Sequence, residues 1–218
     1  MEKDIHIIDN YRNLPLGDHV EIVKIDKDQS LEEIDKRVKI MSILTGKSED
    51  FLLDLPINEF KSLSAKMKFL EKELPEDVLR HADSYQVGKF TLVPVTDIRK
   101  ITTAQYIDFI SFHKAGHDEH IAEILSCLLV PKGKKYNQDY DIMEVQEALR
   151  KDMSVYDAAC LYAFFLASCS TSIVDILTYS RKEAMKVKDK EKREKMLQEI
   201  QRLQTLMRNG DGSPMLMQ

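Results

Sequence analysis

Apolar side chains recur every three or four residues along most of this chain, which is the spacing that places them on one face of an α-helix. The first such run consists of Leu31, Ile34, Val38, Met41 and Leu44. It ends at Gly46, and Ser30 with Glu33 forms a capping box that predicts its first turn. Only seven Gly and six Pro occur in 218 residues, so few positions interrupt helices. We expect a mainly α protein, a multi-helix bundle with a long C-terminal helix.

Further helix starts are marked by a polar residue that is followed three residues later by an acid or an amide. These pairs are Thr102 with Gln105, Asp141 with Glu144, and Ser154 with Asp157. Ser48 predicts the cap of a short helical turn, and Pro56 precedes another amphipathic run over 57–74. Residues 121–129 are apolar on most of their helical surface, which predicts a buried helix. The turn-rich segment 131–140 then predicts an exposed loop.

Two segments have the features of β-strands. Residues 85–95 are rich in aromatic and β-branched side chains around Gly88, which predicts a small β-hairpin. Because proline has no N–H to donate to a neighbouring strand, Pro94 predicts that the second strand lies at an edge. The segment 20–25 alternates between apolar and charged residues, which predicts a half-buried or edge strand.

The net charge indicates which class of partner the chain can bind, and the cysteines indicate the redox state of its compartment. A formal net charge of −5 opposes tight binding to nucleic acid, because phosphate contacts need clustered Lys and Arg. Cys127, Cys160 and Cys169 lie in apolar runs and form no CxxC pair, which predicts reduced, buried thiols of raised pKa in a reducing cytosol. The start has no secretory signal pattern, and the longest uncharged stretch, 158–174, is too short for a membrane span.

Composition changes along the chain predict three parts. Residues 1–29 form an N-terminal arm, residues 30–180 a helical core domain with the hairpin near 85–95, and residues 181–218 a C-terminal helical extension and tail. Within the extension, residues 181–202 hold nine basic and five acidic side chains, a difference of +4. A narrow apolar seam runs along it at i, i+4, i+7 and i+11, as in a helix that docks one stripe on a partner. The seam consists of Met196, Ile200, Leu203 and Met207.

One histidine cluster has a spacing that suits a metal. His113, His117 and His120 at i, i+4 and i+7 would share a helical face, and imidazole nitrogen is a zinc ligand. Gly116 lies between them and favours a break between two helices, which would separate the three rings. The segment also lacks the Glu that directly follows the first His in a HExxH metalloprotease. A solvated turn between helices is therefore the favoured interpretation, and we predict neither a metal nor another cofactor.

Other chemistry-bearing groups favour structural interpretations. The lysines of the loop, Lys132, Lys134 and Lys135, lack the GxxxxGK[ST] spacing of a phosphate-binding loop and suit an exposed turn. No GxSxG nucleophile motif is present. A set of aromatic residues at helical spacing could line a pocket, but core packing is the favoured interpretation. The set consists of Tyr106, Phe109, Phe112, Tyr156, Tyr162, Phe164 and Phe165.

Two stretches carry a resemblance to phage proteins. Residues 41–46, with the sequence MSILTG, and residues 51–56, FLLDLP, are similar to the helical openings of small phage tail-assembly proteins. Residues 103–109, 124–127 and 131–136 resemble virion-module proteins of tailed phages that infect Bacteroidetes, including the crAss-like group. The resemblance implies a role in building a tailed phage particle, and it assigns no functional residue.

These observations favour a non-enzymatic structural or assembly protein of a tailed phage, a head–tail connector or tail ring subunit that acts through protein–protein contacts. We expect a homo-oligomer that contacts other phage structural proteins, with the arm and the extension as contact elements and no specific nucleic acid or membrane. It would reside in the virion, and in the host cytoplasm during assembly. Two alternatives remain: a tail-assembly chaperone absent from the mature particle, and a metal-dependent enzyme that uses His113, His117 and His120.

Overall fold

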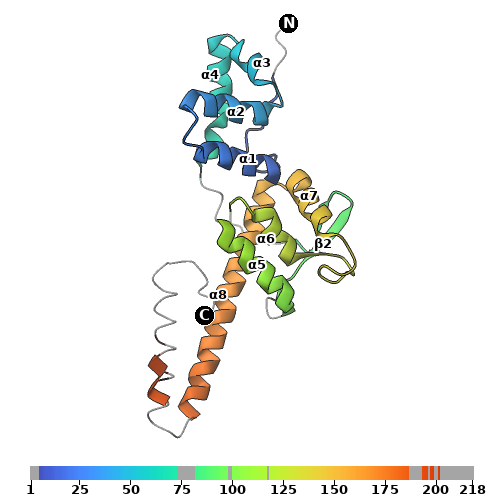
Figure 1. Cartoon of the computed structure of the whole chain (residues 1–218), viewed down its shortest axis with the longest axis vertical. Helices are drawn as coiled ribbons and strands as arrows, with labels where there is room; N and C mark the ends of the chain where they lie inside the picture. Colours follow the sequence, from blue (N-terminus) through green and yellow to red (C-terminus); the bar gives the residue numbers. More distant parts are fainter. Residues whose placement is uncertain are drawn as a thin grey trace. The chain divides into compact units, whose positions relative to one another are not determined.

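A computed structural model defines the fold (Figure 1). It describes residues 5–72, 82–97, 100–116, 118–186, 193–195, 197, 198 and 201, with only the backbone at 169–180, 182–184 and 186. The helices in these ranges are α1 (Leu16–Lys27), α2 (Glu33–Thr45), α3 (Glu49–Leu53), α4 (Ile57–Lys66), the 3-10 helix η1 (Met67–Glu71), α5 (Thr103–Gly116), α6 (Ile121–Leu128), α7 (Ile142–Asp152) and α8 (Val155–Lys186). The strands are β1 (Tyr85–Val87), β2 (Phe90–Pro94) and β3 (Leu129–Pro131). A mainly helical chain with a small hairpin is thus confirmed.

The chain divides into two compact units, Met1–Phe165 and Leu166–Gln218. Helix α8 begins in the first unit, and its residues from 166 onward belong to the second. The division into arm, core and extension at residues 29 and 180 stays a prediction. Beyond Lys186, the described residues 193–195, 197, 198 and 201 are helical.

The strand predicted at 20–25 is wrong, because these residues lie within α1. The helix buries Leu16, Val20 and Ile22 as it packs between α2 and α7. Val20 and Ile22 share the strand period, but on a helix they point in different directions, and both are buried because α1 has neighbours on two sides. The segment expected to form an arm therefore contributes to the core.

A backbone pairing links the start of α1 to the start of α8. The N–H of Leu16 donates to the Met153 carbonyl, and the N–H of Val155 donates to the Leu14 carbonyl, both at 2.9 Å. Pro15 and Ser154 form the isolated antiparallel bridge between these bonds. Nearby, a Cβ at position 17 would lie 3.0 Å from the carbonyl oxygen of Arg150, so Gly17 allows α1 to approach α7 closely.

The capping predictions have different outcomes on either side of Gly46. The Ser30 box is wrong: the Ser30 hydroxyl bonds to Asp28 Oδ1 at 2.6 Å, and α2 begins at Glu33 without a side-chain cap. Gly46 ends α2 as predicted, with a φ of 64° and its N–H on the Ser42 carbonyl. Ser48 caps α3 as predicted, accepting from the N–H of Phe51. The Ser30 hydroxyl thus donates to the nearby Asp28 carboxylate instead of capping α2.

Helix α5 begins at the predicted box. The N–H of Thr102 donates to Gln105 Oε1 at 2.8 Å, and the N–H of Gln105 donates to Thr102 Oγ1 at 3.2 Å. The buried Gln105 amide also donates to the Cys127 carbonyl near the end of α6, at 3.1 Å. That carbonyl has no donor four residues further on, because residue 131 is proline. Asp141 and Ser154 cap α7 and α8, also as predicted.

The predicted hairpin is part of a three-stranded antiparallel sheet in the order β1-β2-β3. The strand containing Pro94 is therefore central, and its predicted edge position is wrong. The proline is tolerated because β1 pairs only as far as Leu92, two residues before Pro94. The N–H of Val95 donates to Leu128 on the β3 side, so the nitrogen of Pro94 points to the other side, beyond the end of β1.

Two hydrophobic clusters form the core of the first unit. The larger one joins the sheet to α5, α6, α7 and the start of α8, through residues that include Leu92, Phe109, Leu125, Leu149 and Phe165. The smaller one is built by the N-terminal segment and α1–α4, with Ile22, Met41, Leu44, Leu52, Leu63 and Phe69 among its members. Helix α1 contributes to both, with Leu16 in the larger cluster and Ile22 in the smaller.

Replacement of the buried amide that caps two helices tests this account of the core. We expect Gln105→Ala to lower the free energy of unfolding by about 1–3 kcal/mol, because the Cys127 carbonyl would then be buried without a donor. Urea denaturation measures the change. Thr102→Ser, which keeps the capping hydroxyl, should remain within about 0.5 kcal/mol of the wild type. An unchanged stability of the Gln105 variant would contradict the assignment.

Candidate interaction site

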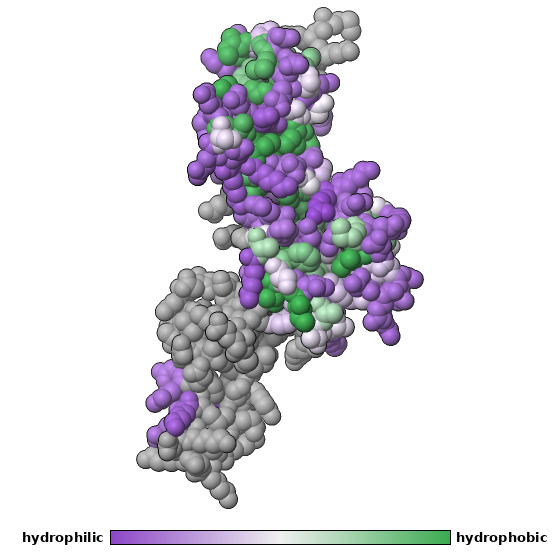
Figure 2. All heavy atoms as spheres, in the orientation of Figure 1, coloured by the Kyte–Doolittle hydropathy of each residue, from purple (hydrophilic) through white to green (hydrophobic). Residues whose placement is uncertain are grey.

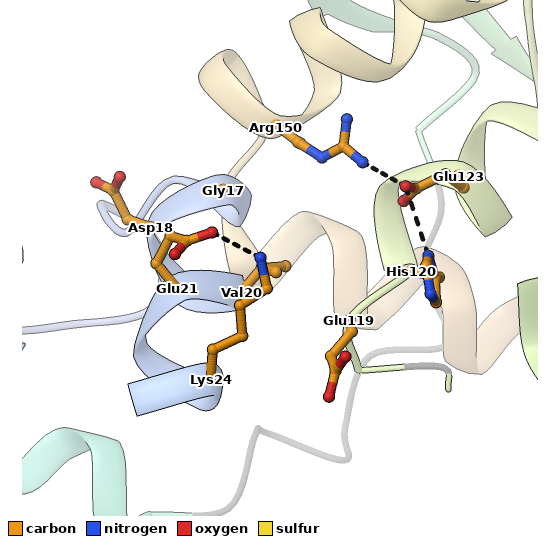
Figure 3. A pocket seen from close by; sticks show the side chains of 9 residues that line it. All are labelled: Gly17, Asp18, Val20, Glu21, Lys24, Glu119, His120, Glu123 and Arg150. Atoms are coloured by element: carbon orange, nitrogen blue, oxygen red, sulfur yellow. Dashed lines mark hydrogen bonds and ion pairs between the residues drawn. The ribbon is translucent and has the colours of Figure 1, made fainter. Parts of the chain in front are cut away.

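A charged pocket of about 380 Å³ lies where α1, α6 and α7 meet (Figure 3). It is lined by Gly17, Asp18, Val20, Glu21, Lys24, Glu119, His120, Glu123 and Arg150. Four acidic side chains face two basic ones, so the lining is net acidic at neutral pH. Its walls are charged side chains rather than the mostly apolar surface typical of small-molecule sites.

The central groups of this pocket bind each other. Glu123, whose side chain is 12% exposed, accepts a hydrogen bond from Arg150 Nη2 through Oε1. His120 Nδ1 lies 3.6 Å from the same oxygen, beyond hydrogen-bond distance. Lys24 pairs with Glu21 at 2.8 Å. The second oxygen of Glu123 is buried without a hydrogen-bond partner in the described structure. The ion pair between Glu123 and Arg150 thus links α6 to α7.

The three histidines singled out by their spacing have separate surroundings. His113 lies on α5, stacks on Phe109 and has its Nδ1 3.1 Å from the Tyr162 hydroxyl. His120 precedes α6 and faces Glu123. Gly116 ends α5 with a φ of 129°, which confirms the break, while His117 lies outside the described residues. Within the described ranges, no three His, Cys, Asp or Glu side chains are placed to hold a metal ion.

The thiols are buried, as predicted. Burial raises the pKa of Cys127 to about 11, and it also raises the pKa of Cys160. Cys127 donates to the Glu123 carbonyl and lies beside Tyr136, whose hydroxyl donates to Asp108 at 2.8 Å. Both thiols are protonated at neutral pH and pack as small apolar groups. The side chain of Cys169 lies outside the described residues.

The loop is exposed, as predicted, and five members of the aromatic set pack in or against the larger cluster, as favoured by the sequence. Lys132, Lys134 and Lys135 are exposed in the turn that follows β3. Phe109 and Phe165 are buried, and Phe112, Tyr162 and Phe164 pack against the larger cluster. Tyr156 lies under the guanidinium of Arg12, which is 3.7 Å from its ring centroid. Tyr106 is 38% exposed and is the most solvent-accessible member of the set.

A surface that sequence reasoning missed lies on α3 and the start of α4. Phe51, Leu53 and Ile57 are 42%, 64% and 64% exposed there, and we call these three residues the α3–α4 face. Figure 2 shows hydrophobic side chains at the surface over this end of the first unit. The signal in the sequence is that five of the seven residues 51–57 are apolar besides Pro56, more than one short helix can bury.

A groove of about 630 Å³ adjoins the α3–α4 face. It is lined by Ile5, His6, Thr45, Lys47, Phe51, Leu55 and Glu59. The ammonium of Lys47 lies 5.9 Å from the centroid of the Phe51 ring, at the rim of the groove. The lining thus mixes apolar side chains with the charged Lys47 and Glu59, a combination found at surfaces that bind other proteins.

The segment that carries the α3–α4 face is acidic. Residues 47–59 carry four acidic side chains and one basic side chain, a net charge of −3. Glu49 pairs with Lys39 at 3.1 Å, whereas no ion pair among the described residues involves the exposed side chains of Asp50, Asp54 or Glu59. The face thus combines exposed apolar groups with an acidic margin.

The predicted partner-binding seam is not placed by the structure. Met196, Ile200, Leu203 and Met207 all lie outside the described residues. Their role in binding a partner stays a prediction. The two candidate surfaces of this chain are therefore the α3–α4 face, found in the structure, and the seam, found in the sequence.

The buried imidazole of His19 predicts a pH dependence of stability. Burial lowers the pKa of His19, and the charge of Asp118 offsets part of this effect. Because the unfolded chain binds the proton more readily, the contribution of His19 is present above about pH 6.5 and is lost as the pH falls. We expect the free energy of unfolding to fall more between pH 7 and pH 5 in the wild type than in His19→Gln. Parallel profiles in chemical denaturation would contradict this.

Comparison with known proteins adds no relative to these observations. No protein-family model, no curated protein and no solved structure matches the chain. None of the helices in the described part of the chain has the length and apolar content that a membrane span needs. We therefore infer the function from the residues and surfaces described above.

Proposed function

We propose that this chain is a non-enzymatic structural or assembly protein of a tailed phage particle, a head–tail connector or tail ring subunit. The observation that carries the proposal is the α3–α4 face, on which three large apolar side chains are exposed beside a groove. The two segments similar to phage tail-assembly proteins, 41–46 and 51–56, are the end of α2 and the segment that carries most of this face. Resemblance and exposed apolar surface thus coincide.

The energetics of the face support a protein-binding role. Fully burying a Leu, Ile or Phe side chain stabilises a complex by about 1.5–3 kcal/mol relative to leaving it in water. Phe51, Leu53 and Ile57 leave about half or more of that contribution unused in the isolated chain. A partner that covers any of these side chains would recover part of that contribution, which is the usual basis of protein–protein affinity.

The non-enzymatic part of the proposal is supported by the pairing of the chemistry-bearing groups. Glu123 is engaged by Arg150, Tyr136 by Asp108, and the Cys127 thiol is held protonated by burial. The Glu123–Arg150 pair links α6 to α7, and the Tyr136–Asp108 hydrogen bond links the loop after β3 to α5. The net charge of −5 also opposes a nucleic-acid partner.

In the proposed assembly, each copy contacts the next through two different surfaces. Such heterologous contacts form a ring when the rotation between copies closes. The C-terminal helix would reach beyond the core and present the seam, and other phage structural proteins would bind the ring. The protein would reside in the virion, and in the host cytoplasm while particles assemble.

The same face also suits a second candidate function, a tail-assembly chaperone. A chaperone would cover apolar segments of another helical protein until the tail tube forms, and it would then be absent from the finished particle. An exposed groove of about 630 Å³ has room for such a segment. The third hypothesis, an enzyme using His113, His117 and His120, draws less support because His113 and His120 have separate neighbours.

Quantitative mass spectrometry of purified phage particles tests the proposal. We expect the chain to be present at a copy number that is a simple ratio of the portal copy number, because a ring that abuts the portal repeats with a related symmetry. Absence from particles, despite expression in infected cells, would overturn the structural role and favour the chaperone.

Truncation tests the proposed use of the extension. Deletion of residues 195–218 removes the whole seam and should leave a folded monomer that no longer assembles. Deletion of residues 208–218 is the matched control, because it keeps all four seam residues and should assemble normally. Analytical ultracentrifugation and circular dichroism measure assembly and folding. Normal assembly of the longer truncation would show that the extension is not the contact.

A further inference from the structure

We propose that the α3–α4 face is the docking surface for the basic extension, residues 181–207, of a second copy of this chain. This inference rests on the proposed function, because it identifies the two surfaces through which copies would assemble. The two surfaces have opposite charges, both carry apolar side chains, and every copy of the chain has both of them.

The charges of the two surfaces are opposite. Residues 47–59 carry −3, and residues 181–202 carry +4. The acidic side chains at the face remain exposed, and among the described residues only Glu49 of the four forms an ion pair, with Lys39. Asp50, Asp54 and Glu59 are thus placed to meet Lys and Arg side chains of a docked segment.

The apolar groups also match in scale. A seam at i, i+4, i+7 and i+11 would present one narrow stripe on a helix. The α3–α4 face presents large exposed apolar side chains beside a groove whose lining includes Ile5 and Leu55. Two of the four seam residues, Met196 and Met207, are methionines, whose flexible side chains fill irregular apolar grooves. A segment with basic side chains and one narrow apolar stripe therefore suits this groove.

Each copy carries one face and one seam, and the two differ. The contact between copies is therefore heterologous: each copy binds one neighbour through its face and another neighbour through its seam. A contact of this kind makes a specific prediction: two copies that are damaged at different surfaces still retain one intact pair between them.

Complementation between full-length variants tests the inference. Ile57→Asp places a charge on the face, and Leu203→Asp places one on the seam. We expect each variant alone to be monomeric in sedimentation velocity, with the dissociation constant raised at least about tenfold over the wild type. An equimolar mixture should form a dimer and no larger species, because only one intact face–seam pair exists. A mixture that stays monomeric while the wild type assembles would overturn the inference.

Controls separate the docking contact from loss of folding. Ile107→Asp on α5 is matched in residue type, and Ile107 is 56% exposed against 64% for Ile57, so it should assemble as the wild type does. Circular dichroism and thermal unfolding should be the same in all four proteins. If Ile107→Asp disrupts assembly equally, or if the wild type is itself monomeric at about 100 μM, the inference is wrong.

Salt and particle composition give two further readouts. Raising the salt concentration should weaken wild-type self-association, because opposite charges meet at the contact. If the chain is present in particles but Ile57→Asp assembles normally, the docking inference fails and the structural role stands. If the chain is absent from particles but the complementation dimer forms, the structural role fails and the contact stands.

Discussion

The first unit depends on the pairing of residues 14–16 with residues 153–155. These segments are far apart in the sequence, yet two backbone hydrogen bonds of 2.9 Å hold them together at the start of α8. The pairing fixes where α1 begins, and α1 then contributes Leu16 to one hydrophobic cluster and Ile22 to the other. Because Gly17 has no side chain, the helix can lie directly against α7. A single short contact thus couples the two cores of the unit.

The shortness of α3 explains why apolar side chains remain at the surface. Helix α3 has only five residues and buries Leu52 completely, so its neighbours Phe51 and Leu53 necessarily point in other directions. The smaller cluster is completed by α1, α2, α4 and η1, and the exposed Phe51 and Leu53 are not among its members. The face is therefore a consequence of packing a very short helix against a small core.

Local signals in the sequence predicted local structure, and distant contacts decided the rest. The boxes at Thr102 and Ser154 and the break at Gly116 involve residues within a few positions of each other, and all three are confirmed. The strand expected around Val20 failed because helix α1 is selected by its packing on α2 and α7. The edge expected at Pro94 failed because β3 comes from a segment 35 or more residues away. The exposure of Ile57 likewise depends on tertiary packing, which the amphipathic run predicted over 57–74 does not reveal.

The uneven charge of the chain would select between modes of the proposed self-association. The whole chain carries −5 and residues 181–202 carry +4, so the remainder carries −9. Two faces brought together would repel each other, as would two extensions, whereas a face and an extension attract. At physiological ionic strength the Debye length is about 8 Å, so these forces act only as the surfaces meet. In the proposed assembly, charge would therefore favour the pairing of unlike surfaces, and burial of Phe51, Leu53 and Ile57 would supply the affinity.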